Sequence, residues 1–243
     1  MPMNKILIQK YISLIDLTSL SSNDNETSIK SLCESIKPEF HPAAICTYFN
    51  QLPTVLKEKP STIKSAVVAG HFPSGQATLE QKVAELVFIS ISDVDEIDIV
   101  INRGQLIAGN TDYTRAEIKS AREIIGDKCL KVILETGDLS AAQIALGSSI
   151  AIKEGADFIK TSTGKSSVGA TIEAVRIMAQ SIKEGRTSTG IKISGGLRTF
   201  DEMHEYVSLI TDILGKQWIK PSTFRVGASA LYNQLIADYK NYD

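Results

Sequence analysis

Two lysines stand inside short apolar runs, and each run leads into a glycine. Lys160 lies in Ala156–Ser166, which reads as a buried strand followed by a polar loop with one glycine. Thirty-two residues later, Lys192 occupies the same place in Gly190–Gly196. An ammonium group is costly to bury, so a lysine in such a strand is expected to titrate low and become nucleophilic. The pair predicts an enzyme that forms a Schiff base with a phosphorylated carbonyl compound.

The elements that position these lysines alternate between short β-branched runs and longer amphipathic stretches. Helical spacing of apolar residues is found in stretches such as Leu79–Ile91, Thr114–Ile125, Ser140–Lys153, Thr171–Ile182, Phe200–Leu214 and Ser229–Tyr239. Eight strands are predicted: Leu14–Thr18, Ala43–Tyr48, Lys64–Gly70, Glu96–Asn102, Lys131–Gly137, Asp157–Thr163, Ile191–Gly195 and Phe224–Gly227.

This alternation favours an α/β fold, a (β/α)₈ TIM barrel. An open doubly wound sheet also alternates, but it usually carries GxGxxG after its first strand, where this chain reads Asp16–Leu20. No linker interrupts the pattern, so we expect a single domain over residues 1–243.

The period of two within the strands sends ionisable groups to one interior. In Glu96–Asn102 the isoleucines share one face, and Asp98 lies on the other face with Glu96. The same reasoning places Asp16, Lys160 and Lys192 inside the barrel, with Glu135 as a possible fifth group.

The two lysines are expected on adjacent strands, with their amines roughly 6 Å apart. At an effective dielectric of about 20, two like charges at that distance repel by roughly 3 kcal/mol. This repulsion would lower the pKa of one lysine, so that Lys160 attacks a carbonyl, Lys192 activates it and Asp98 shuttles protons. The alternative is that each lysine extends to solvent or forms a structural salt bridge, which becomes less plausible when two lysines and two aspartates converge.

Glycines close several of these strands at the end where a barrel places its active site. Exposed backbone amides near helix N-termini bind phosphate, and barrels commonly place such a site after strands seven and eight. The expected phosphate-binding residues are Gly164, Lys165, Gly195, Gly196, Gly227 and Ser229.

Composition excludes several other classes of protein. Hydrophobic residues make up 43% and charged residues 22%, the net charge is −2, and no basic stripe suggests nucleic-acid binding. No apolar run approaches the roughly 18 residues of a membrane span. Three widely spaced cysteines form no disulfide framework, which favours a cytoplasmic location. Three scattered histidines argue against a histidine-ligated metal, and no metal or organic cofactor is expected.

Nearly the whole chain resembles the deoxyribose-phosphate aldolase family. The resemblance is carried in order by Leu14–Thr18, Glu96–Asn102 with Ala108–Asn110, Lys131–Gly137, Asp157–Lys165, Lys192–Thr199 and Phe224–Ser229. It implies a class I aldolase on a TIM barrel that splits 2-deoxy-D-ribose 5-phosphate reversibly into D-glyceraldehyde 3-phosphate and acetaldehyde. It also implies a possible homodimer.

By the same resemblance, Lys160 matches the Schiff-base lysine, Lys192 the second lysine and Asp98 the proton donor and acceptor. The resemblance also implies that Asp16, Thr18, Cys46 and Thr163 lie near the substrate, and it supports the phosphate-binding residues named above. Three positions depart from the family pattern: Ala230 replaces a second serine, Ile193 is bulky, and Tyr242 would have to stand in for a terminal tyrosine.

Two other readings remain open at this point. One is another lysine-dependent aldolase or transaldolase that acts on a longer sugar phosphate. The other is a non-catalytic barrel that binds sugar phosphates as a sensor, although a sensor has no need of two coupled lysines.

Overall fold

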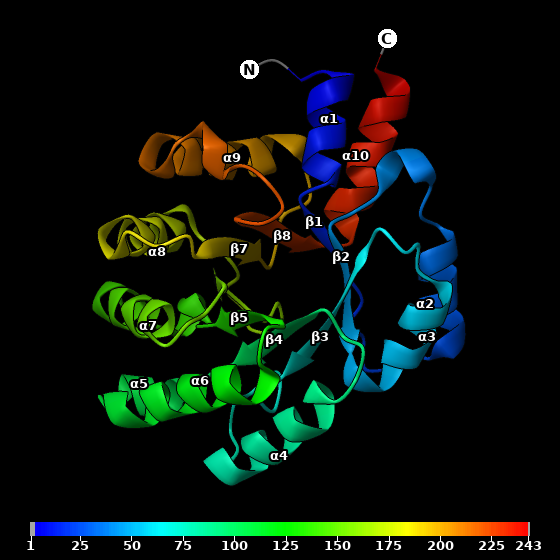
Figure 1. The fold of residues 1–243 in the computed structure, drawn as a ribbon. Coiled ribbons are helices and arrows are strands. Elements are labelled where there is room, and N and C mark those ends of the chain that lie inside the picture. The colour runs from blue at the N-terminus through cyan, green and yellow to red at the C-terminus, as the bar shows by residue number, and fades with distance from the viewer. Residues whose placement is uncertain (1–2, 243) are drawn as a thin grey trace.

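Eight parallel strands close into a barrel in the computed structural model, which describes residues 3–242 (Figure 1). Each strand pairs with its neighbours in chain order, and β1 pairs with β8 to close the ring. The strands are β1 (Ile15–Thr18), β2 (Ala44–Tyr48), β3 (Lys64–Ala69), β4 (Glu96–Val100), β5 (Cys129–Ile133), β6 (Phe158–Lys160), β7 (Gly190–Ser194) and β8 (Phe224–Ala228).

Helices surround the barrel, as the (β/α)₈ prediction required, and α1 and α10 lie side by side (Figure 1). The helices are α1 (Lys5–Ile12), α2 (Glu26–Glu34), α3 (Leu52–Glu58), α4 (Leu79–Ser90), α5 (Arg103–Ile107), α6 (Thr111–Ile125), α7 (Ala141–Lys153), α8 (Ile172–Gly185), α9 (Phe200–Leu214) and α10 (Ala230–Asn241). No helix within residues 3–242 is long and apolar enough to span a bilayer.

The sequence specifies where several of these helices begin. Thr78, Ser140 and Thr199 each accept a hydrogen bond from the backbone three residues later. The side chain of that later residue, Gln or Glu, reaches back to the cap in every case. These capping boxes satisfy amides that the first helical turn leaves without partners.

The outer faces of the strands pack on the helices to form the main hydrophobic core. Ile97 and Ile99 of β4, Ile159 of β6, and Ile191 and Ile193 of β7 are buried in this layer. The alternation predicted from the sequence is therefore confirmed, because the intervening side chains point into the barrel.

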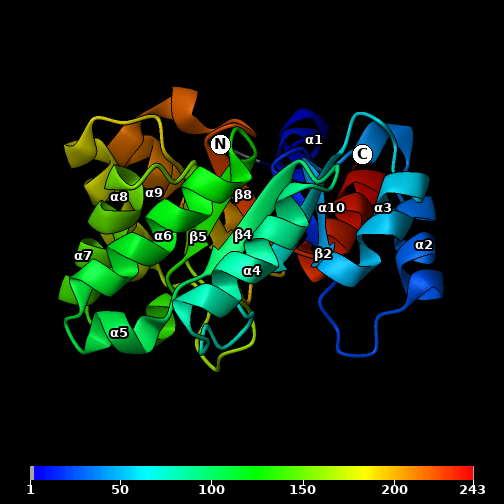
Figure 2. The same ribbon diagram turned by 60° about the horizontal axis from the view of Figure 1, so that its bottom comes forward.

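The barrel interior has an apolar side and a charged side. Ala44 and Cys46 of β2 and Ala66 and Val68 of β3 form a small apolar cluster with Leu20. The other strands place carboxylates, lysines and one arginine inside, all of them at most 5% exposed. Figure 2 shows the loops that follow β1 and β6 on the same side of the barrel, so both lie at its carboxyl end.

Two strands differ from the prediction in ways that affect the site. The β5 strand runs over Cys129–Ile133 and ends before Glu135, which has a left-handed backbone conformation. The β6 strand covers only Phe158–Lys160, so the segment after Lys160 is already a loop. In addition, α1, α2, α3 and α5 fall outside the stretches that helical spacing singled out.

Candidate active site

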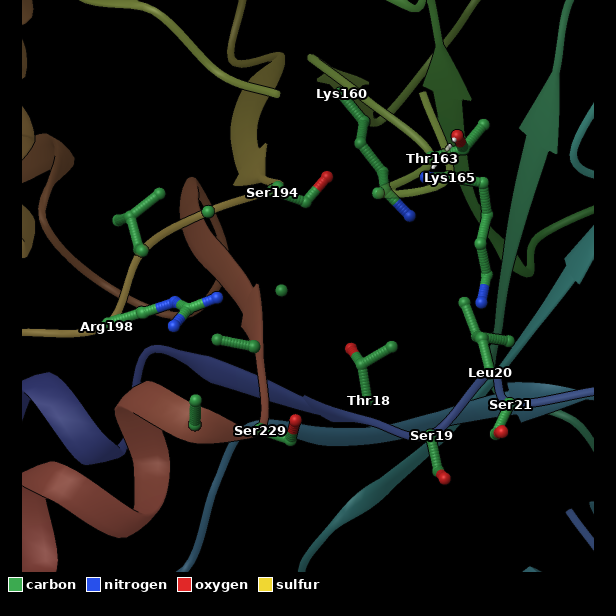
Figure 3. A pocket seen from close by; sticks show the side chains of 17 residues that line it. Thr18, Ser19, Leu20, Ser21, Lys160, Thr163, Lys165, Ser194, Arg198 and Ser229 are labelled. Carbon is green, nitrogen blue, oxygen red and sulfur yellow. Dashed lines mark hydrogen bonds between the residues drawn. The ribbon is translucent and has the colours of Figure 1, made fainter. Parts of the chain in front are cut away.

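A cavity of about 440 Å³ opens at the carboxyl end of the barrel, and Lys160 lines it (Figure 3). The loops after β1, β6, β7 and β8 supply its walls. Its lining residues are Thr18, Ser19, Leu20, Ser21, Lys160, Thr163, Gly164, Lys165, Ser194, Gly195, Gly196, Leu197, Arg198, Gly227, Ala228, Ser229 and Ala230.

The amines of Lys160 and Lys192 meet at one carboxylate. Lys160 and Lys192 are register partners on β6 and β7. Both donate to Oδ2 of Asp98, from 2.8 Å for Lys160 and 2.7 Å for Lys192. The two nitrogens therefore lie no farther apart than the sum of these distances. All three side chains are at most 3% exposed, so only the end of Lys160 reaches the cavity.

Beneath these three groups lies a buried network. Lys131 contacts the carboxylates of Glu96 at 2.5 Å and Asp98 at 2.9 Å, and lies 3.7 Å from Asp16. Arg225 pairs with Asp16 at 2.5 Å and with Glu96 at 2.9 Å.

Counting charges in this cluster indicates which base loses its proton most readily. Three carboxylates (Asp16, Glu96 and Asp98) face four bases (Lys131, Lys160, Lys192 and Arg225), so full ionisation would leave one buried positive charge in excess. An uncompensated buried charge is strongly unfavourable. Lys160 contacts one carboxylate, whereas every other base contacts at least two. Lys160 is therefore the base that most readily loses its proton.

The directions of the pKa shifts agree with this count. Burial lowers the pKa of Lys160, and the charge of Lys192 lowers it further against the opposing effect of Asp98. Burial also acts on Lys192, but Asp16 and Asp98 outweigh it and hold the Lys192 pKa above its usual value. The surrounding bases outweigh the burial of Asp98 and keep its pKa well below the usual range. The site thus brings an amine of lowered pKa, an ammonium and a carboxylate into contact.

The six predicted phosphate-binding residues all line the cavity. Gly164, Gly195 and Gly196 have φ of 77°, 90° and 107°, a conformation that favours glycine. Ser229 stands at the N-terminus of α10, where backbone amides and the helix dipole attract anions. Figure 3 shows the side chain of Arg198 entering the cavity from the side opposite Lys165.

The four predicted substrate residues separate into two groups. Thr18 and Thr163 line the cavity, so the structure brings them to Lys160. Asp16 and Cys46 are fully buried below it and do not line it. Asp16 instead forms ion pairs with Lys192 and Arg225, and burial raises the pKa of the Cys46 thiol.

The three departures from the family pattern have different consequences. Ala230 lines the cavity at the first position of α10, where it offers an amide but no hydroxyl. Ile193 packs in the outer core, so its bulk does not reach the cavity. Tyr242 follows the end of α10, about 18 Å of helix away from Ser229, and the structure does not bring it to the site.

Sequence reasoning missed three charged groups: Lys131, Arg225 and Arg198. The period of two could have found the first two. Val132 and Val226 pack outward, which turns Lys131 and Arg225 into the barrel. Arg198 lies in the loop before α9, where no periodicity predicts orientation. Within residues 3–242, no group of three or more His, Cys, Asp or Glu side chains is arranged to hold a metal ion.

Comparison with known proteins identifies the family. Residues 10–218 match the model of the DeoC/LacD family aldolases. The chain belongs to this family. A Caenorhabditis elegans protein named "Putative deoxyribose-phosphate aldolase" is 38% identical over 248 residues, which cover 96% of this chain and 82% of that protein. A crystal structure with the same description, from Coccidioides immitis, superposes with a TM-score of 0.84 at 29% identity, covering 95% of this chain and 86% of that one.

The fold extends to more distant members. A Toxoplasma gondii structure with 22% identity has a TM-score of 0.84 and covers 98% of both chains, which shows the shared barrel. Lys160 and Lys192 both donate to Asp98 at the carboxyl end of the strands. Barrel enzymes place their active sites at this end.

Proposed function

We propose that this protein is a class I deoxyribose-phosphate aldolase, which reversibly cleaves 2-deoxy-D-ribose 5-phosphate into D-glyceraldehyde 3-phosphate and acetaldehyde. The observation that carries the proposal is the amine of Lys160, which has a lowered pKa and reaches from a buried cluster into a cavity of about 440 Å³. Family membership supports the reaction class.

The proposed reaction begins when the neutral amine of Lys160 attacks C1 of the open-chain sugar. Loss of water from the resulting carbinolamine gives an iminium ion, which withdraws electrons from the neighbouring carbon. Lys192 remains protonated and favours the neutral form of Lys160. It therefore acts on the nucleophile through its charge.

Cleavage then requires a proton to leave the C3 hydroxyl. As that proton departs, the C2–C3 bond breaks, glyceraldehyde 3-phosphate is released and the bonding electrons form an enamine on Lys160. Asp98, whose low pKa keeps it ionised, is the proposed acceptor, acting through water, and later returns the proton to C2. Hydrolysis of the new iminium ion releases acetaldehyde and restores Lys160.

Phosphate binding at the rim would orient the sugar. The glycine backbone amides, the α10 N-terminus, Lys165 and Arg198 line the cavity, and the side chains of Lys165 and Arg198 enter it from opposite sides (Figure 3). Anchoring the phosphate there would leave the aldehyde end of the chain to reach Lys160.

Trapping with borohydride tests the reaction class and the nucleophile together. Incubation with acetaldehyde and sodium borohydride should leave an ethyl group on Lys160, located by peptide mass spectrometry. A protein that binds the sugar phosphate but yields no adduct would instead support the sensor reading. If dihydroxyacetone phosphate served as donor better than acetaldehyde, the protein would be an aldolase for a longer sugar.

A substitution at Gly227 tests whether the position of Lys192 matters. An alanine Cβ there would lie 3.2 Å from Cβ of Ser194 and 3.3 Å from Cε of Lys192, closer than ordinary contact. We expect Gly227→Ala to displace Lys192, to lower turnover at neutral pH roughly tenfold, and to cost about 1–3 kcal/mol of stability. Activity across pH and urea unfolding measure the two effects. Unchanged activity would show that the site tolerates this movement.

A homodimer in the cytoplasm remains part of the proposal. The dimer is expected from the resemblance of the sequence to its family, and the cytoplasmic location from the absence of a disulfide framework. Light scattering on the purified protein measures the assembly, and a monomeric mass would remove the dimer from the proposal without affecting the chemistry at Lys160.

A further inference from the structure

Glu135 is a buried carboxylate at the mouth of the barrel that takes no part in the charged cluster. Its side chain is 0% exposed. Thr163 donates to it twice: the backbone N–H lies 3.3 Å from both carboxylate oxygens, and the hydroxyl lies 2.5 Å from Oε2. Among residues 3–242, Thr163 is the carboxylate's only partner. A buried carboxylate devoted to one residue points to a specific task for that contact.

The backbone at Glu135 is held in a strained conformation. Its φ of 59° and ψ of 61° lie in the left-handed region, which side chains other than asparagine and aspartate rarely adopt. Backbone hydrogen bonds on both sides of Glu135 hold this turn against the end of β6. The N–H of Leu134 donates to the carbonyl of Lys160, and the N–H of Thr136 donates to the carbonyl of Thr161. Strain that the surrounding structure enforces is often found where a side chain must be aimed for function.

The contact continues from Thr163 into the cavity wall. Because the Thr163 hydroxyl gives its proton to Glu135, its oxygen is free to accept, and the backbone N–H of Lys165 donates to it at 3.0 Å. Gly164, with φ of 77°, makes the turn between them. Thr163, Gly164 and Lys165 all line the cavity. Glu135 therefore controls the shape of this loop through one side chain.

We propose that Glu135 is the positioning residue of the loop Thr163–Lys165 and makes the site selective for a phosphorylated ligand. We expect Glu135 to strengthen the binding of any phosphate monoester and of inorganic phosphate. Its consequence for sugar selectivity rests on the proposed aldolase function.

The chemistry of the contact requires a carboxylate. Thr163 presents two donors, and an ionised carboxylate accepts at both oxygens. An amide of the same shape has one acceptor oxygen and turns an NH₂ group toward the remaining donors. Glu135→Gln should therefore loosen the loop while conserving the volume of the side chain.

The experiment measures phosphate binding and sugar selectivity separately. Calorimetry with inorganic phosphate, and kcat/KM with 2-deoxyribose 5-phosphate and with unphosphorylated 2-deoxyribose, are compared for the wild type and Glu135→Gln. We expect phosphate affinity and kcat/KM for the phosphorylated sugar to fall about tenfold, as for loss of a hydrogen bond to a charged group. The loss in kcat/KM for the phosphorylated sugar should appear as a higher KM. The kcat/KM for unphosphorylated 2-deoxyribose should stay within about twofold of the wild-type value.

Glu85→Gln is the matched control. Glu85 accepts from the backbone N–H groups of Gly70 and His71, so it also holds a loop after a strand, but none of these residues lines the cavity. Its substitution should leave phosphate affinity unchanged. If Glu135→Gln does not fold, Thr163→Val removes the same link from the other side and should weaken phosphate binding in the same way.

Equal losses on both sugars, or unchanged phosphate affinity in Glu135→Gln and Thr163→Val, would overturn the proposal. Failure of the aldolase function looks different. A wild-type protein that cleaves neither sugar refutes the function, and the calorimetric comparison still decides the role of Glu135.

Discussion

Lys160→Leu should abolish aldol cleavage, with kcat lowered by at least about four orders of magnitude. In the proposed mechanism, the covalent bond to the substrate forms at this amine, because burial lowers its pKa and its end reaches the cavity. Lys192 does not line the cavity, and Asp16 and Asp98 hold its pKa above the usual value. The measurement is acetaldehyde release from 2-deoxyribose 5-phosphate, with borohydride trapping on the same samples.

The fold should survive this substitution, which makes the result interpretable. Asp98 keeps two partners, Lys192 at 2.7 Å and Lys131 at 2.9 Å, so no buried carboxylate is left unpaired. Removal of Lys160 also leaves three carboxylates opposite three bases. The thermal midpoint should therefore not fall. Appreciable turnover in a folded Lys160→Leu protein would mean that another residue is the nucleophile.

Local sequence patterns predicted the barrel and most of the cavity. Alternation in strands such as Glu96–Val100 determines which side chains enter the interior, and a closed parallel sheet then brings Asp98 and Lys160 together although they are 62 residues apart. The glycines of the rim were predictable for the same reason, since they directly follow strands that converge on one face.

The rest depended on information that single strands do not carry. Lys131 and Arg225 looked like ordinary strand residues, and their importance appears only when the neighbouring strands β4 and β1 place Glu96 and Asp16 against them. Glu135 was predicted to extend β5 into the interior, but the left-handed turn redirects it to Thr163. That turn is imposed by hydrogen bonds to β6, which no local pattern in β5 reveals.

The balance of charges leads to the second large effect, in Lys192→Leu. This substitution removes the excess positive charge, so three bases face three carboxylates and Lys160 no longer has to be neutral. The pKa of Lys160 should rise. Because the neutral amine is the reactive form, the limb of the rate profile on which activity increases with pH should move to higher pH. At pH 7 the rate should fall about a hundredfold and recover in alkaline buffer.

Three comparisons separate a charge effect from a direct role of Lys192 in proton transfer. Lys131→Met removes one positive charge without touching the cavity and should shift the profile in the same direction. Glu96→Gln removes a carboxylate and so increases the excess of buried positive charge, which should shift the pH profile toward lower pH. Lys128 donates to the backbone carbonyls of Ser92 and Val94, outside the charged cluster, so Lys128→Leu should leave the pH profile unchanged. If only Lys192→Leu changed the profile, Lys192 would act by its position, and the count of buried charges would not explain the low pKa of Lys160.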